Sequence, residues 1–139
     1  MQPDEARSRF AATPVARLAT VGDDGRPHLV PVCFAVLGER IVTAVDHKPK
    51  RSSRLRRLAN IEVNPAVCLL VDAYDPADWT ALWWARADGT ARLADADAPG
   101  SAAAIDALVE RYPQYRVTRP EGPVIEIAVT RWSGWSAAG

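Results

Sequence analysis

The 139-residue sequence lacks the segments that mark membrane and secreted proteins. Its apolar runs all fall well short of the ~20 residues that a membrane-spanning helix needs. The first five residues include Asp4 and Glu5 and do not follow the basic-then-apolar order of a signal peptide. We therefore expect a cytoplasmic protein that does not span a membrane.

Residues typical of metal sites and nucleophilic catalysis are also scarce. The two cysteines, Cys33 and Cys68, lie in apolar runs without a cysteine or histidine at metal-ligand spacing, so we interpret them as buried free thiols and predict no metal site. The sequence has no Gly-x-Ser-x-Gly or Cys-x-x-Cys motif, which argues against a hydrolase or a thiol-redox enzyme. The only histidines, His28 and His47, lie in no catalytic motif, and no catalytic residue is predicted.

Net charge is absent as well, since 17 basic residues balance 17 acidic ones. The positive charge is nevertheless concentrated in residues 46–57, here called the basic segment, which contain both lysines, four arginines and one acidic residue. A general nucleic-acid-binding protein usually has a basic excess over a whole face, so this local cluster favours a compact anionic ligand. A solvated helix face is one alternative interpretation, and a nucleic-acid contact through Arg54, Arg56 and Arg57 is another.

The apolar pattern predicts a single domain, residues 1–139, of the α+β class with mainly β structure. Tight turns between short alternating segments indicate a barrel of about six or seven antiparallel strands with two or three short helices. The helices are expected at residues 4–12, 52–60 and 101–112. The strands are expected at residues 15–21, 28–37, 40–45, 66–74, 79–87, 90–93 and 124–132.

Two local signals refine this prediction. Asp88-Gly89 is a typical two-residue hairpin turn, so we expect separate strands before and after it. Pro31 has no N–H for a strand ladder, so we expect it at a sheet edge, at a bulge or where the backbone meets a ligand.

Three parts of the sequence form a pattern together. They are residues 25–32 (Gly-Arg-Pro-His-Leu-Val-Pro-Val), the strand at 41–45 that leads into the basic segment, and Asn64-Pro65 before an apolar strand. This pattern resembles the pyridoxamine 5'-phosphate oxidase-like flavin and deazaflavin proteins over nearly the whole chain. The compact length, the Trp83-Trp84 pair and the ending at 131–135 (Arg-Trp-Ser-Gly-Trp) are most similar to the branch that uses coenzyme F-420, an 8-hydroxy-5-deazaflavin.

The resemblance implies an FMN-binding type of split β-barrel that forms a homodimer, with a cofactor groove at the subunit interface. Small side chains and backbone of two strand ends would lie against the ring, and Trp79 could form a further wall. The basic segment would hold the phosphate or the tail. The implied cofactor-binding residues are Pro31, Val32, Ala44, Val45, Lys48, Lys50, Arg51, Ser52, Arg54 and Trp79.

The function implied is hydride transfer between reduced F-420 and an unidentified small conjugated substrate. The several cations of the basic segment match the oligoglutamyl tail of F-420 better than the single phosphate of FMN. Two alternatives remain open: an FMN-dependent oxidoreductase, and a non-catalytic protein that binds a flavin, a deazaflavin or haem. Haem would need an axial residue such as His28 or His47. Pyridoxamine phosphate oxidation is less favoured because no second phosphate site is identified.

Overall fold

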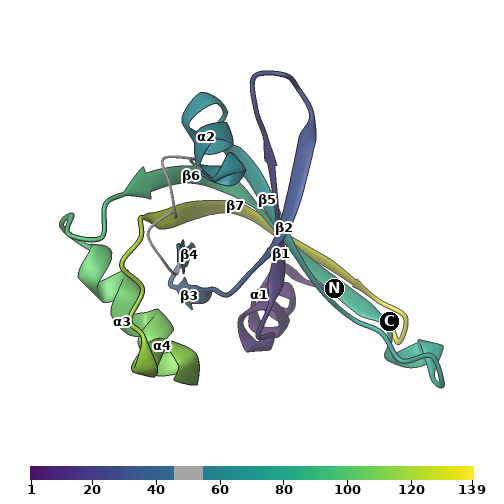
Figure 1. Cartoon of the computed structure of the whole chain (residues 1–139). Helices are drawn as coiled ribbons and strands as arrows, with labels where there is room; N and C mark the ends of the chain where they lie inside the picture. The colour runs from purple at the N-terminus through teal and green to yellow at the C-terminus, as the bar shows by residue number, and fades with distance from the viewer. Residues whose placement is uncertain (46–54) are drawn as a thin grey trace.

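The computed structural model describes residues 1–45 and 55–139, which form one antiparallel sheet with helices packed on it (Figure 1). Within these ranges there are seven strands, four α-helices and one 3₁₀ turn. The strands are β1 (Ala16–Val21), β2 (Pro27–Val32), β3 (Ala35–Leu37), β4 (Arg40–Ala44), β5 (Ala66–Ala73), β6 (Trp83–Ala94) and β7 (Val124–Ser136). The helices are α1 (Pro3–Ala12), α2 (Arg56–Val63), α3 (Ser101–Arg111) and α4 (Pro113–Val117), and the 3₁₀ turn is η1 (Trp79–Ala81).

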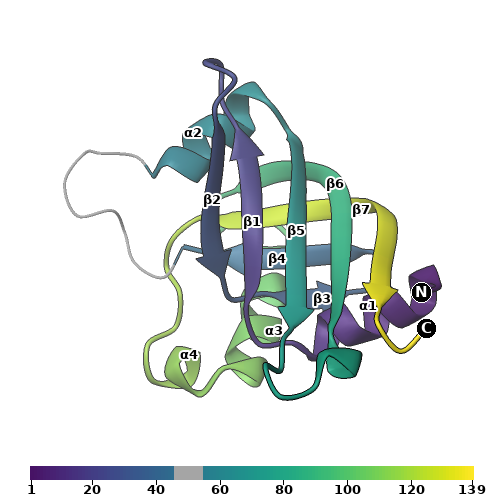
Figure 2. The ribbon, with the colours of Figure 1, turned by 90° about the vertical axis from the view of Figure 1, so that its right-hand side faces the viewer.

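The sheet folds over itself into a barrel. Its strand order is β2-β1-β5-β6-β7-β4-β3. The 12-residue β6 and the 13-residue β7 are long enough to belong to both halves, because β5 pairs with the first part of β6 and β4 with the first part of β7. Figure 2 shows β2, β1 and β5 crossing in front of β4 and β3. The predicted mainly β fold of about seven antiparallel strands is confirmed.

The interior of the barrel is mainly apolar, and side chains of α1 contribute to it. Phe10 of α1 is fully buried, and its ring centroid lies 4.9 Å from that of Phe34 and 5.2 Å from that of Trp132. The strands add fully buried side chains from both halves of the sheet, including Leu18, Ile41, Leu69 and Ile127. Burial of this surface from the two halves is the main force that closes the barrel.

A second apolar cluster joins α3 to β4 and β7. Leu108 of α3 packs in this cluster with Val42 and Val124. At the end of α3, the Arg111 guanidinium donates hydrogen bonds to the carbonyl oxygens of Thr13, at 2.5 Å, and Phe34, at 2.7 Å. Arg111 therefore fixes the chain just before β1 and just before β3.

Several predicted boundaries were wrong. The strand expected at 28–37 is divided into β2 and β3, because the Phe34 ring turns into the core and its N–H donates to the Tyr112 hydroxyl at 3.0 Å. The helix expected at 52–60 is described from Arg56 and continues to Val63; residues 52–54 lie outside the described ranges. The final strand continues to Ser136, because its last residues pair with the start of β6.

The hairpin expected at Asp88-Gly89 is also absent, since β6 runs through this position without a turn. The partner strand has a bulge there, where the register shifts from Asp88 opposite Arg131 to Gly89 opposite Val129. Gly89 is needed for a close approach: a Cβ atom here would lie 2.5 Å from the carbonyl oxygen of Ala128 and 2.8 Å from Ile127 Cγ2. The glycine thus permits a contact between strands instead of a turn.

We predict that Gly89→Ala lowers the free energy of unfolding by about 1–3 kcal/mol, because the added methyl group overpacks a fixed backbone contact. Urea denaturation measures the change, with Thr90→Ala at the neighbouring exposed position as the control and an expected effect within about 0.5 kcal/mol. Equal stabilities of the two variants would contradict the close contact between Gly89 and the Ala128 carbonyl group.

Two further findings concern the described part of the chain. It contains no helix that is both long and apolar enough to cross a membrane. It also contains no group of three or more histidine, cysteine, aspartate or glutamate side chains placed to hold a metal ion. Cys33 and Cys68 are free thiols as expected, but both are only half-buried.

Candidate cofactor-binding site

The outward side of the first half of the sheet carries large apolar and aromatic side chains. Alternation along β5 and β6 places Val71 and Ala85 in the core, so the neighbouring residues point outward. The register aligns these residues in two rows, Pro31–Arg17–Leu70–Arg86 and Asp72–Trp84–Trp135. We call these seven residues the outer face.

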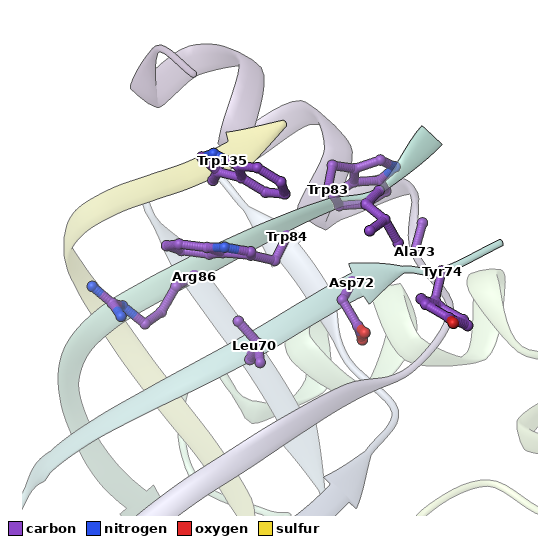
Figure 3. A pocket seen from close by; sticks show the side chains of 9 residues that line it. Leu70, Asp72, Ala73, Tyr74, Trp83, Trp84, Arg86 and Trp135 are labelled. Atoms are coloured by element: carbon purple, nitrogen blue, oxygen red, sulfur yellow. The ribbon is translucent and has the colours of Figure 1, made fainter. Parts of the chain in front are cut away.

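A pocket of about 350 Å³ opens on the outer face where β5, β6 and β7 meet (Figure 3). Leu70 of β5, Trp84 of β6 and Trp135 of β7 lie on three successive strands along it, and Trp84 and Trp135 are directly opposite each other. Trp135 is 48% exposed and Leu70 39% exposed, which is unusual for such large apolar groups. The described residues that line it are Leu70, Asp72, Ala73, Tyr74, Leu82, Trp83, Trp84, Arg86 and Trp135.

Arg86 and Asp72 are the charged members of this lining. The Arg86 guanidinium lies 5.4 Å from the centroid of the Trp84 ring and donates a hydrogen bond of 3.3 Å to Asp88. Its side chain is still 40% exposed. The Arg86–Trp84 contact fixes a cation beside an aromatic surface, an arrangement that suits a flat, conjugated ligand with polar atoms at its edge.

The thiol of Cys68 lies on the same side of the sheet as this pocket and close to it. Cys68 is on β5 directly opposite Asp88 of β6. Burial raises the pKa of the Cys68 thiol, and the negative charge of Asp88 raises that pKa further. A raised pKa keeps the thiol protonated near neutral pH, so Cys68 is a poor nucleophile.

The residues predicted to lie against the ring occupy different surroundings. Pro31 lies exposed on β2, an edge strand of the sheet, which is one of the three places that its missing N–H predicted. Val32 is buried, and so are Ala44 and Val45, which belong to different apolar clusters. Val45 also donates its N–H to Pro123 at 3.0 Å and accepts the Gly122 N–H at 3.1 Å. Contact of these four residues with a ring stays a prediction.

The predicted tail-binding residues cannot be placed. Lys48, Lys50, Arg51, Ser52 and Arg54 lie outside the described ranges, as does His47. The flanking residues Val45 and Leu55 both contact the barrel core.

Trp79 is not on a strand, contrary to the prediction. The Asp78 carboxylate accepts the Thr80 N–H at 3.0 Å and so favours the 3₁₀ turn η1 over an extended conformation. Trp79 is 66% exposed and does not line the pocket, although it lies on the loop between Tyr74 and Leu82, which do.

The pocket itself was missed, because its lining is assembled by strand register. The alternation that puts Trp84 and Arg86 on one side of β6 was present in the sequence, as was that of Leu70 and Asp72 on β5. Which strands pair, and in which register, cannot be derived from such local patterns.

His28 faces away from this pocket. It pairs with the buried Thr20 of β1, whose hydroxyl accepts a hydrogen bond of 3.0 Å from Asn60 of α2. Among the described residues, His28 Nδ1 is buried without a hydrogen-bond partner. His28 is therefore no axial ligand for a group bound in the pocket.

The pocket and the predicted ring wall at the end of β4 lie far apart within one chain. Ala44 pairs with Val124, which pairs with Ala94 at the end of β6, whereas Trp83 and Trp84 are at its start. At about 3.3 Å per residue, the path along β6 is roughly 35 Å, and the curvature of the strand makes the straight distance shorter. The two surfaces therefore lie at opposite ends of β6.

Comparison with known proteins identifies a family and several structures of similar fold. The family model described as pyridoxamine 5'-phosphate oxidase matches residues 2–136. A search of the curated proteins found no match.

Solved structures with a similar fold include three described as follows. A conserved hypothetical protein from Mycobacterium tuberculosis is 22% identical over 99% of this chain and 86% of its own, with a TM-score of 0.77. A FAD-binding protein from Mesorhizobium loti is 20% identical over 96% and 94%, with a TM-score of 0.74. The heme storage protein from Vibrio cholerae is 19% identical over 98% and 95%, with a TM-score of 0.71.

Proposed function

Because the chain belongs to the pyridoxamine 5'-phosphate oxidase family and has its split-barrel fold, we propose that it is an F-420-dependent oxidoreductase. In this proposal a homodimer binds the deazaflavin in a groove between its subunits. A hydride then passes between the reduced cofactor and a small conjugated substrate. The observation that carries the proposal is the pocket on the outer face, where tryptophan rings and one arginine surround a space suited to a flat conjugated ring.

The relatives support a ring of the flavin type. Proteins of similar fold from Mesorhizobium loti and Mycobacterium smegmatis are described as FAD-binding. The choice of F-420 depends on the basic segment, which has six cations against one acidic residue. Several guanidinium and ammonium groups match a phosphate followed by a chain of carboxylates, whereas FMN ends in one phosphate.

The separation of the pocket from the end of β4 within one chain supports a groove that is completed by a second subunit. The pocket and the end of β4, which leads into the basic segment, are at opposite ends of β6. A second copy that covers the outer face would bring its own β4 end and basic segment towards the pocket of the first. The outer face also exposes apolar surface that dimer formation would bury, with Leu70 39% exposed and the adjacent Leu29 65% exposed.

The chain's own residues would bind and orient the cofactor. Trp84 and Trp135 offer flat surfaces for the ring, and Arg86 offers N–H donors to polar atoms at its edge. Leu70 and Leu82 would exclude water from the same space. When bound, the reduced cofactor would supply the hydride and solvent water the proton that completes the reduction, so the main task of the protein is to position two rings.

A mixed dimer tests this arrangement. We expect Trp84→Ala to weaken F-420 binding about tenfold or more, since one aromatic stacking partner contributes about 1–3 kcal/mol. Lys48→Ala/Lys50→Ala/Arg51→Ala should weaken it at the other wall of the groove. Heterodimers of the two variants, purified with two different tags, are expected to recover one normal F-420 site per dimer. In one groove the altered pocket faces the altered basic segment, whereas in the other groove both walls have the original residues.

Val63→Ala at an exposed position of α2 serves as the control for Trp84→Ala and should bind F-420 normally in its homodimer. Heterodimers with no normal site would show that both walls belong to one chain. A monomer in sedimentation experiments at all concentrations would exclude the shared groove.

Haem binding without turnover is a second candidate, favoured by the similar fold of the heme storage protein from Vibrio cholerae. Among the described pocket residues, Tyr74 is the side chain that could ligate haem iron. A Soret band that Tyr74→Phe abolishes would support this candidate. The same band in both proteins would count against ligation in the pocket.

A further inference from the structure

A second charged cluster lies on the other half of the sheet, around Glu126 of β7. Glu126 is only 7% exposed, and its two carboxylate oxygens accept hydrogen bonds from two arginines of the flanking strands. Arg40 of β4 donates to Oε1, and Arg92 of β6 donates to Oε2. We call these three residues the arginine clamp.

Both arginines of the clamp remain open to solvent. The side chain of Arg40 is 50% exposed and that of Arg92 is 71% exposed. Each guanidinium carries five N–H groups, so a bond to Glu126 leaves donors for another acceptor. Two cations against one carboxylate also give the clamp a net charge of +1.

The surface between the arginines is formed by small side chains. Arg40 lies opposite Ala128, and Ala128 lies opposite Thr90, in a row next to the row of Glu126 and Arg92. Ala128 and Thr90 are both exposed. Neither Ala128 nor Thr90 is bulky enough to keep a small group from this part of the clamp.

Burial of Glu126 explains why the carboxylate has hydrogen-bond partners, but one guanidinium could bond both of its oxygens in the two-pronged geometry that arginine favours. Two arginines, each on one oxygen, are instead held on either side of Glu126. Such preorganisation lowers the entropy cost of binding an anion, and the planar guanidinium fork matches the oxygens of a phosphate.

We propose that the arginine clamp is a binding site for a phosphate group, separate from the tryptophan pocket. The phosphate would accept free N–H groups of Arg40 and Arg92 on the solvent side of the clamp, and its negative charge would offset the surplus positive charge. The site is on the half of the barrel away from the tryptophan pocket, because Arg92 and Trp84 are near opposite ends of β6. The proposal stands without the F-420 assignment, since it uses none of the pocket residues.

Titration of the full chain with inorganic phosphate at constant ionic strength tests the clamp. Because the basic segment also attracts phosphate, the measurement must report on the clamp itself. The arginine Nε–H signals in proton–nitrogen NMR spectra provide this, and single alanine variants assign them to Arg40 and Arg92. We expect both signals to shift along one saturating curve. Arg92→Ala should weaken the binding reported by Arg40 at least tenfold, and Arg92→Lys should recover only part of it.

Arg119 provides the matched control. It is an exposed arginine that pairs with Asp106 at 2.6 Å, with a side chain 51% exposed. Its signal should shift little and without saturation, and Arg119→Ala should leave the clamp titration unchanged. Clamp signals that shift only as Arg119 does, or a saturating Arg40 curve that survives Arg92→Ala, would overturn the proposal.

Discussion

Simultaneous replacement of Lys48, Lys50 and Arg51 by alanine is expected to weaken F-420 binding by at least 100-fold. A hydrogen bond to a charged group contributes about 1.5–3 kcal/mol, and each 1.4 kcal/mol corresponds to a factor of ten in affinity. Three such contacts would exceed 100-fold if they were additive, but solvent screening and shared partners reduce the sum. The fluorescence of the deazaflavin during titration with protein measures the change.

Two comparisons separate specific contacts from general charge. Lys48→Arg/Lys50→Arg keeps both charges and should bind within a few fold of the original protein. Arg26→Ala removes a charge from the exposed turn before β2 and should have no effect. Raising the salt concentration should weaken binding to the original protein more than to the triple variant. A triple variant that binds F-420 within threefold of the original would place the polyanionic tail elsewhere.

The second large effect concerns the barrel. Phe10→Ala is expected to lower the free energy of unfolding by about 3–5 kcal/mol. The Phe10 ring is fully buried and contacts the rings of Phe34 and Trp132, so its removal leaves a cavity between α1 and the sheet. Chemical denaturation at one fixed protein concentration measures the loss, because dimer formation would make the apparent stability depend on concentration.

Two variants of α1 calibrate this measurement. Ser8→Ala changes an exposed position of the same helix and should stay within about 0.5 kcal/mol of the original protein. Phe10→Leu keeps most of the buried volume and should cost less than the alanine variant. A loss below 1 kcal/mol for Phe10→Ala would show that α1 does not help to close the core.

The strand pattern of the barrel could be predicted because each half-buried strand has its own alternation. The edge position of Pro31 is one of the three places that its missing N–H allowed. At Gly89 the same local reasoning failed. Asp-Gly is a strong turn signal in isolation, but here the glycine is required by the Ala128 carbonyl of another strand, which is a tertiary constraint.

In the candidate site, too, some features are evident from local sequence and others depend on tertiary structure. The charge of the basic segment is evident in sequence, and its role as a tail-binding loop stays a prediction because residues 46–54 lie outside the described ranges. The tryptophan pocket depends on the register of β5, β6 and β7, so Trp84 and Trp135 could not be brought together beforehand. Residues 79–87 are predicted to form one strand, whereas the Asp78 carboxylate caps the 3₁₀ turn η1 and β6 begins only at Trp83.

The most direct test of the proposed function is equilibrium dialysis of the purified protein against F-420 and FMN, side by side in one buffer. We predict one F-420 bound per chain and FMN binding at least tenfold weaker, since FMN lacks the carboxylates of the tail. Tight FMN binding without F-420 binding would contradict the deazaflavin assignment, and absence of binding for both would contradict a cofactor groove of this type.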